Sequence, residues 1–290
     1  MKPFFRYPGG KSKIAKRIVC TMLERCPADS ILDYREPFLG GGSVGLELLQ
    51  HLNPGTFVWI NDANAQLAGI WAMVLEDPQQ LVERISSYEP RVDDFYAYKS
   101  ILQANSDKTS LLDRAVMHLI MSQISYSGLG VMSGGPLGGK DQKSKYKIDC
   151  RWSPKTMCKK IQRAHELLSK FDVRCTSCNY TTLLEAVTDN TVIYVDPPFF
   201  MRGDQLYQQH FSIEDHKILS ERLKELDCNW FLSYDECLEV RELYSWTDIT
   251  ELSQSYTLNN RGKVTELLIS KFEPNVRQSS ASRRQFLDSV

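Results

Sequence analysis

The chain has 290 residues and a formal net charge of −1; 42% of its residues are hydrophobic and 24% are charged. No apolar run approaches the roughly 20 residues that a membrane-spanning helix needs, and the N-terminal segment lacks the apolar core and cleavage site of a secretory signal. We therefore expect a cytoplasmic globular protein without a membrane partner, long enough for one large α/β domain with an insertion or for two modest domains.

The first part of the chain alternates strand and helix patterns. Residues 30–38 are typical of an extended segment, residues 42–52 of a helix, and residues 56–60 of a second apolar strand that ends at Asn61 and Asp62. This alternation predicts an α/β fold.

The turn between the first predicted strand and its helix is rich in glycine, in the sequence EPFLGGGSVG. Glycines let the backbone approach a ligand closely, and the N-terminus of the following helix supplies unpaired N–H groups. Such a turn can also serve close packing alone. An acidic residue after the next strand, here Asp62, can bind both hydroxyls of a ribose. The two features together favour a nucleoside cofactor.

The middle of the chain changes character twice. Residues 63–126 show consecutive helical patterns without an obvious strand, as expected for an inserted helical bundle. Residues 125–147 are rich in Gly, Ser and Lys, and we expect them to form a mobile, exposed loop with few residues anchored in a core. Nine Lys and Arg residues lie from Lys140 to Arg163, opposed by two Asp. This run is either a solvated helix face with a loop or a contact surface for phosphates.

Strand and helix patterns resume after a basic helix at residues 154–170. The expected strands lie at residues 172–176, 191–195 and 229–234, followed by closing antiparallel strands at 247–252, 253–258 and 264–272. A helix is expected at residues 212–226. The polar segment 275–290 is expected to be a disordered tail.

The strand at 191–195 ends in Asp196-Pro197-Pro198-Phe199. Proline has no N–H, so the two prolines end strand pairing and leave their carbonyl oxygens free. The Asp196 carboxylate and a proline carbonyl are two acceptors without a competing donor, which suits the two hydrogens of an exocyclic amino group. Holding these hydrogens out of the ring plane restores the lone pair to nitrogen, which can then attack an electrophilic methyl group. The alternative is a plain strand terminator.

The eight cysteines are scattered along the chain, which suits a reducing compartment with free thiols. Cys175 and Cys178 form a Cys-x-x-Cys pair, but a closed zinc site needs four ligands and no second pair has matching spacing. We therefore expect buried thiols there and no metal. His210 and His216 are expected on the surface near the mouth of the pocket, without a ligand role.

Four ordered motifs, FRYPGGKSK, REPFLGGGSVG, YVDPPFF and YTLNNRGKVTELLISKF, resemble those of the Dam-like, D12-class, alpha-group adenine-N6 DNA methyltransferases. The resemblance spans residues 4 to about 274. It implies the class I S-adenosylmethionine-dependent methyltransferase fold: an α/β, Rossmann-like mixed sheet, mostly parallel with one antiparallel strand, carrying an inserted and mainly helical target-recognition domain. It also implies S-adenosyl-L-methionine as the cofactor and double-stranded DNA as the partner, and leaves any protein partner unknown.

The resemblance implies a division of the chain and a set of site residues. Residues 1–74 and 151–274 would form the catalytic and cofactor-binding domain, and residues 75–150 the target-recognition domain. The catalytic residues would be Asp196, Pro197, Pro198 and Phe199, with Phe199 stacked on an adenine flipped out of the duplex. The residues implied to touch the cofactor are Tyr7, Lys11, Phe38, Gly40, Ser43, Asp62, Asn179, Tyr180 and Asp196. Ser233 and Tyr234 match a later strand-end motif of the pocket.

The expected DNA contacts lie in a basic, glycine-rich hairpin at residues 127–147. They are Tyr126, Ser127, Lys140, Lys143, Lys145 and Lys147, with the lysines on phosphates. This region departs from the family pattern, because SQISYSG replaces Asn-Arg-x-x-Tyr-Asn-Gly. Val131 stands where an arginine reads guanine in members that recognise GATC. The resemblance therefore does not set the target sequence.

Two other functions stay open on the sequence alone. Related motifs serve amino-group methyltransferases that act on cytosine N4, on RNA or on protein glutamine, although an aspartate at position 196 favours adenine. The second alternative is a DNA-binding module with a catalytically silent pocket. The presence of Lys11, Asp62 and Asp196 together argues against it.

Overall fold

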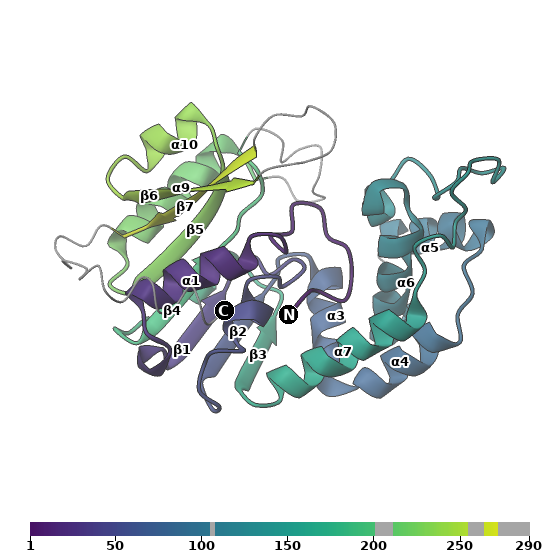
Figure 1. Cartoon of the computed structure of the whole chain (residues 1–290), viewed down its shortest axis with the longest axis horizontal. Coiled ribbons are helices and arrows are strands. Elements are labelled where there is room, and N and C mark those ends of the chain that lie inside the picture. The colour runs from purple at the N-terminus through teal and green to yellow at the C-terminus, as the bar shows by residue number, and fades with distance from the viewer. Residues whose placement is uncertain (105–107, 201–210, 255–263, 272–290) are drawn as a thin grey trace.

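The computed structural model describes residues 1–104, 108–200, 211–254 and 264–271, and its centre is a seven-stranded sheet (Figure 1). The strands are β1 (Asp33–Glu36), β2 (Phe57–Asn61), β3 (Asp172–Thr176), β4 (Thr191–Val195), β5 (Asn229–Asp235), β6 (Asp248–Gln254) and β7 (Val264–Ser270). Their order is β3-β2-β1-β4-β5-β7-β6. Neighbours from β3 to β5 pair in parallel, and β7 runs antiparallel to β5 and β6. This mixed sheet confirms the predicted class I methyltransferase fold.

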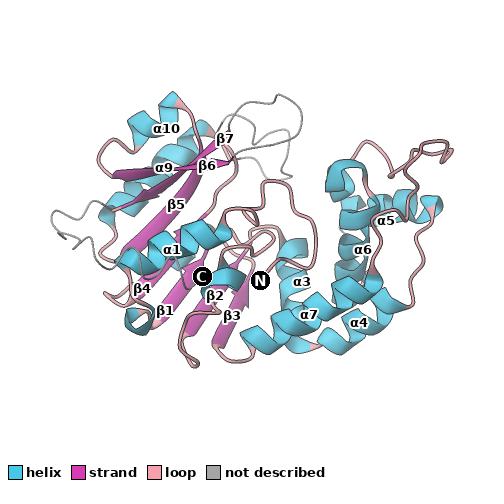
Figure 2. Ribbon diagram, in the orientation of Figure 1, coloured by secondary structure: helices cyan, strands magenta, loops and turns pink. Residues whose placement is uncertain are grey.

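Helices cover both faces of the sheet (Figure 2). The α-helices of the described residues are α1 (Ala15–Arg25), α2 (Gly45–Leu48), α3 (Ala65–Glu76), α4 (Pro78–Ser86), α5 (Val92–Ala104), α6 (Leu111–Ile124), α7 (Pro154–Leu168), α9 (Ile213–Glu225) and α10 (Leu238–Leu243). Sequence patterns predicted neither α1 nor α10. Both are amphipathic covers of the sheet whose short apolar faces are broken by charged residues.

The central strand β4 contributes side chains to the hydrophobic cores on both faces of the sheet. All of its side chains are buried, because helices on both faces of a parallel sheet leave neither face to water. Val192 and Tyr194 belong to the core that includes α1, whereas Ile193 and Val195 belong to the core beneath α9 and α10. Alternate side chains of one strand therefore anchor opposite layers. This strand also carries Asp196 at its carboxyl end, so a rigid element positions that carboxylate.

Helices α3 to α7 form a group beyond β3, at the end of the sheet (Figure 1). Within it α3 packs on α6 and α4 packs on α7. The group is inserted between β2 and β3, which nevertheless pair directly with each other. Consecutive helices across residues 63–126 confirm the predicted helical insertion, and α7 confirms the predicted basic helix. The helical group therefore emerges from one edge of the sheet, beside the ends of β2 and β3.

The loop after α6 contradicts the expectation that few of its residues are anchored in a core. Ser125 and Ser133 are fully buried, and Val131 and Leu137 are also in the core. The Ser133 hydroxyl donates to the Gly135 carbonyl at 2.8 Å, and the Ser125 hydroxyl accepts from the Gly130 N–H at 2.8 Å. Buried serine hydroxyls thus satisfy backbone groups that composition alone suggested would face water.

The expected hairpin is also wrong in form. The segment contains two 3-10 turns, Tyr126–Gly128 and Gly130–Met132, and a single isolated bridge between Ser125 and Pro136. Its backbone is shaped by left-handed residues, with φ of 58° at Ser127 and positive φ at several glycines, which favour turns over a regular ladder. We call residues 125–147 the recognition loop below.

Two further expectations fall on parts of the chain outside the described residues. These are residues 255–258 of the expected strand 253–258, whose first two residues belong to β6, and the tail 275–290. Within the described parts, no helix has the length and apolarity needed to cross a membrane.

Candidate active site

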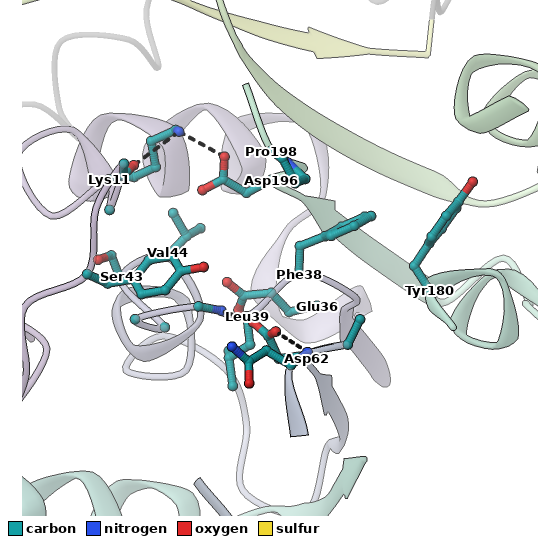
Figure 3. A pocket seen from close by; sticks show the side chains of 18 of the residues that line it. Lys11, Glu36, Phe38, Leu39, Ser43, Val44, Asp62, Tyr180, Asp196 and Pro198 are labelled. Atoms are coloured by element: carbon teal, nitrogen blue, oxygen red, sulfur yellow. Dashed lines mark hydrogen bonds and ion pairs between the residues drawn. The ribbon is translucent and has the colours of Figure 1, made fainter. Parts of the chain in front are cut away.

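A cavity of about 260 Å³ lies at the carboxyl ends of β1, β2 and β4 (Figure 3). The chain order reverses between β1 and β4, and ligands of open α/β sheets bind at such switch points. The predicted residues that line the cavity are Tyr7, Lys11, Phe38, Gly40, Ser43, Asp62, Asn179, Tyr180, Asp196 and Pro198. The structure therefore brings every predicted cofactor residue to one place.

The glycine-rich turn forms the floor of the cavity and is confined between two aromatic rings. Gly40 and Gly42 have φ of +48° and +63°, where side chains are strained. A Cβ at Gly40 would lie 2.7 Å from the Tyr7 ring, and one at Gly42 would lie 2.6 Å from Trp71. The Trp71 indole N–H also donates to the Gly40 carbonyl at 3.0 Å. Glycine is required here for packing as well as for access by a ligand.

Asp62 follows β2 and closes the same turn. Its carboxylate accepts from the Gly40 N–H at 2.8 Å and from the Asn64 N–H at 2.9 Å. Burial raises the pKa of Asp62 to about 6, although both N–H donors oppose the rise. A carboxylate has about four lone-pair positions, so each oxygen keeps acceptor capacity for a hydroxyl.

Sequence reasoning gave no role to Asn61, which fixes the loops around this carboxylate. The Asn61 amide donates to the carbonyls of Pro37 and Cys178, at 3.0 and 3.1 Å, and its oxygen accepts from the Cys178 N–H at 2.9 Å. The residue is 1% exposed. A buried amide at the end of an apolar strand was the available signal, because such a group must find partners.

The tip of β4 carries an ion-pair cluster. The Lys11 ammonium forms an ion pair with Asp196 (Figure 3), 2.8 Å from Oδ1. It also lies 3.0 Å from Glu266 Oε1. Burial opposes the charge on Lys11, but the two carboxylates raise its pKa above the usual value. Burial raises the pKa of Asp196, and Lys11 limits the rise. Lys11 also lies 5.5 Å from the centre of the Phe199 ring. Phe199 is half-buried, beside the cavity wall rather than on it.

Glu36 is a further carboxyl group in the cavity that sequence reasoning passed over. It is 2% exposed and accepts from the Tyr34 hydroxyl at 2.8 Å. Burial raises its pKa to about 8, and nearby Asp196 adds to the rise. A Cβ at Gly45 would lie 2.2 Å from Glu36 Oε2. The last glycine of the predicted turn is therefore needed to accommodate this carboxyl group.

The cavity has an excess of acidic groups. Lys11 is close to Asp196 and Glu266, and Glu36 is coupled electrostatically to Asp196. The two carboxylates beside one ammonium leave net negative charge, which favours a bound cation. The signal for Glu36 and Glu266 was an acidic residue inside an apolar strand pattern, since such residues are rarely buried without a partner.

An aromatic cluster forms the opposite side of the cavity. The rings of Phe38 and Tyr180 are stacked with centres 5.2 Å apart, and Phe211 lies 5.8 Å from Phe38. These faces suit a flat heterocycle. The Asn179 side chain lines the cavity but also caps the next turn, accepting from the Thr181 N–H at 3.0 Å. Phe211 was not predicted to belong to the site.

The expectation for His216 is wrong. Its ring is fully buried between Phe200 and Phe211, each 4.7 Å away, and Nδ1 lies 2.5 Å from the Tyr234 hydroxyl. Burial lowers the pKa of His216 to about 4. His216 shares the inward face of α9 with Leu219 and Leu223, and that helical spacing was the missed signal. Tyr234 is buried too, and it contacts His216 behind the cavity instead of lining the cavity itself. His210 lies outside the described residues.

Cys175 and Cys178 are both partly buried. The Cys175 thiol lies 3.6 Å from the Ala68 carbonyl, and burial raises its pKa to about 12. In the parts of the chain that the structure describes, no group of three or more His, Cys, Asp or Glu residues is placed to hold a metal ion.

The predicted DNA contacts lie away from the cavity, on the recognition loop. Tyr126 is 65% exposed, and the predicted lysines of the loop, Lys140, Lys143, Lys145 and Lys147, are exposed as well. The Ser127 carbonyl accepts from Arg6, next to Tyr7, at 3.4 Å. Val131 is buried, so its side chain is not available to a base edge in this arrangement.

Known proteins resemble this chain over most of its length. A family model described as D12 class N6 adenine-specific DNA methyltransferase matches residues 7–258. Type II methyltransferase M1.LlaDCHI from Lactococcus lactis subsp. cremoris is 25% identical over 94% of this chain and 96% of its own. Type II methyltransferase M.MjaIII from Methanocaldococcus jannaschii is 26% identical over 69% of each chain. Among solved structures, precorrin 8w decarboxylase from Methanobacterium thermoautotrophicum spans 94% of this chain and all of its own, with 13% identity and a TM-score of 0.39.

Proposed function

Because the chain belongs to the D12 class of N6 adenine-specific DNA methyltransferases, we propose specific roles for the residues of the cavity and of the recognition loop. The enzyme transfers a methyl group from S-adenosylmethionine to N6 of adenine at specific sites in DNA. One observation carries the assignment: Asp196, at the tip of β4 and paired with Lys11, faces an acidic cavity with an aromatic wall.

The residues around the cavity fit the cofactor. S-adenosylmethionine supplies an electrophilic methyl group on a positively charged sulfonium. Phe38 and Tyr180 would hold its adenine, with Asn179 alongside, and Asp62 would accept from its ribose hydroxyls. The glycine turn, Tyr7 and Ser43 would enclose it. The excess of carboxyl groups, Asp196 and Glu266 beside Lys11 and Glu36 under the electrostatic influence of Asp196, favours the positive charge of its methionine end.

Asp196 and the Pro197 carbonyl would accept the two hydrogens of the target amino group. Lys11 binds Oδ1 of Asp196, which orients the carboxylate and leaves Oδ2 for the substrate. As the new N–C bond forms and the S–C bond breaks, positive charge builds on N6, and the adjacent carboxylate stabilises it. N6 then loses a proton. The raised pKa of Asp196 makes it a better acceptor for that proton.

The amino group of adenine lies inside the duplex stack, so we propose that the base is flipped out and stacked on Phe199. Pro198 lines the cavity beside it. Residues 75–150 would contact the target, with Tyr126 and Ser127 near base edges and the exposed lysines Lys140, Lys143, Lys145 and Lys147 on phosphates. Residues 1–74 and 151–274 would carry cofactor binding and catalysis. DNA as the substrate also supports a cytoplasmic location.

The test is Asp196→Asn, which keeps the size of the side chain but replaces one acceptor oxygen with a donor. We expect methyl transfer to fall by at least 10²-fold, while DNA still binds. Activity is measured as labelled methyl incorporated into DNA, followed by identification of the modified nucleoside. Asp227→Asn is the matched control, because its side chain is fully exposed on the loop before β5. Equal turnover in both variants would refute the role of Asp196.

A further inference from the structure

A second cavity, of about 220 Å³, lies between the N-terminal segment, the end of α6 and the start of α7. Three cationic side chains line it: Arg6, Arg151 and Lys160. Its other lining residues include Ser153, Thr156 and Gln123, and none is acidic. Three positive charges around one hollow, without a negative side chain among them, form an electrostatic site for an anion.

Few donors of these three side chains are used by the residues that the structure describes. Lys160 donates one hydrogen bond to the Pro3 carbonyl at 3.0 Å, and Arg6 donates one to the Ser127 carbonyl at 3.4 Å. Arg151 forms no ion pair or hydrogen bond with the residues that the structure describes. Since an arginine carries five N–H donors and a lysine three, most of the donors around the hollow are available to a ligand.

The cations also repel one another. Burial lowers the pKa of Arg6, and Arg151 lowers it further. Burial lowers the pKa of Lys160, and Lys2 adds to this effect. Groups held together in this way are stabilised by a bound anion. The other basic residues of α7, such as exposed Lys159, do not line the hollow.

The polar atoms at the start of α7 complete the hollow. The Ser153 hydroxyl donates to the Thr156 hydroxyl at 2.8 Å, which leaves the Thr156 hydrogen free to donate outward. Ser153 is the N-cap residue but makes no side-chain cap bond, so first-turn N–H groups lack that partner. Gln123 is 9% exposed and adds a buried amide to the wall.

The hollow is linked directly to both functional regions. Arg6 precedes Tyr7, which lines the cofactor cavity, and its guanidinium lies against Gly128 of the recognition loop. A Cβ at Gly128 would lie 3.0 Å from the Arg6 Cζ atom. Arg6 and Arg151 are exposed. An anionic group that belongs to a larger molecule can therefore reach the hollow from the surface.

We propose that Arg6, Arg151 and Lys160 bind one backbone phosphodiester of the DNA substrate, at a site separate from the lysines of the recognition loop. This inference rests on the proposed function, because it takes duplex DNA as the ligand. The contact is independent of base sequence and fixes the position of the strand relative to the recognition loop. It couples that position to the cofactor cavity through the Arg6–Tyr7 segment.

The test compares Arg151→Gln with Lys159→Gln, two variants that each remove one positive charge beside or on α7. The probe is a short duplex carrying the sequence that the enzyme methylates in a host free of other methylation. We expect Arg151→Gln to weaken binding about tenfold and to reduce the slope of log K against log salt by about 0.9, the value for one phosphate contact. Lys159→Gln should keep the wild-type slope.

Neutral methylphosphonates placed one at a time along the duplex identify the phosphate. One position should weaken wild-type binding and have no further effect on Arg151→Gln, since the two changes remove the same contact. Additive losses at every position would overturn the proposal. A second result would also overturn it: Arg151→Gln is no longer stabilised by inorganic phosphate, but its DNA salt slope stays at the wild-type value. The hollow would then bind a free anion and not a DNA phosphate.

Failure of this inference is distinguishable from failure of the proposed function. If wild type binds and methylates the duplex while Arg151→Gln and Lys159→Gln behave alike, only the phosphate site is wrong. If wild type methylates no adenine in that host and binds no duplex DNA, the proposed function itself falls. Unchanged S-adenosylmethionine affinity in Arg151→Gln shows that the variant is folded, because the cofactor cavity contains none of the substituted side chains.

Discussion

Glycine serves different purposes in the cavity floor and in the recognition loop. At Gly40 and Gly42 a positive φ coincides with an aromatic ring in direct contact, so no other residue fits. At Gly134 and Gly135 a Cβ would meet nothing within 4 Å. The order of the loop comes instead from Ser125 and Ser133, which are buried and hydrogen-bonded. Glycine is thus required by the backbone and the packing of the cavity floor, whereas in the recognition loop the glycine content does not indicate whether the loop is ordered.

The largest effect on cofactor binding is expected from Gly42→Ala. The new methyl group would lie 2.6 Å from Trp71 at a φ of +63°, which destabilises the fold by roughly 2–4 kcal/mol. Because the turn lines the cavity, the Kd for S-adenosylmethionine should rise more than tenfold. Urea unfolding and calorimetric titration measure the two quantities.

Gly134→Ala is the matched control from the other region. Gly134 does not have a positive φ and has open space around it, so its unfolding free energy should stay within about 0.5 kcal/mol of wild type. Equal destabilisation by the two alanines would remove the distinction between the turn and the loop.

Glu36→Gln is expected to change the pH dependence of both stability and cofactor binding. The pKa of Glu36 is about 8 in the folded protein and about 4.3 in an unfolded chain. The folded state therefore holds this proton more tightly, so its contribution to stability is present below about pH 4.3 and is lost as the pH rises toward 8. Each pKa unit corresponds to about 1.4 kcal/mol, so the loss amounts to several kcal/mol.

The unfolding free energy of Glu36→Gln, measured at pH 5 and pH 9, should lack this decline. Binding of a cationic cofactor near neutral pH should also release a proton from Glu36 in the wild type and not in the variant. Titrations in two buffers with different ionisation enthalpies measure that release. Identical proton release in both proteins would show that Glu36 stays in one protonation state and does not sense the cofactor's charge.

The fold and much of the site were predictable because each followed from a local pattern. β3 and β4 coincide with the predicted strands, and the acid and glycine motifs meet at the expected edge of the sheet. Glu36 was missed although its partner Tyr34 lies two residues away on the same face of the same strand. Glu266 was missed because its partner Lys11 is revealed only when distant segments of the chain meet. The packing of the recognition loop also depends on tertiary contacts, which composition does not encode.

The smallest effect is expected from Ser133→Ala, which tests whether the recognition loop is held in one shape. The Ser133 hydroxyl donates to the Gly135 carbonyl at 2.8 Å and accepts from the Gly135 N–H at 3.3 Å. Its loss leaves the half-buried Gly135 N–H without this partner, whereas the Gly135 carbonyl still accepts from the Tyr126 N–H at 2.9 Å, so the local cost is about 1 kcal/mol.

The recognition loop of Ser133→Ala should therefore sample more conformations. DNA affinity should fall a few-fold, because ordering the loop when DNA binds then costs more free energy. Hydrogen exchange of residues 125–138 should speed up, while S-adenosylmethionine affinity stays unchanged. Ser144→Ala removes an exposed serine hydroxyl from the same loop and should leave both measurements at the wild-type level. If the amide hydrogens of the two variants exchange at the same rate, the buried serine does not order the loop. The cavity floor and the recognition loop would then differ only in which of their residues have a positive φ.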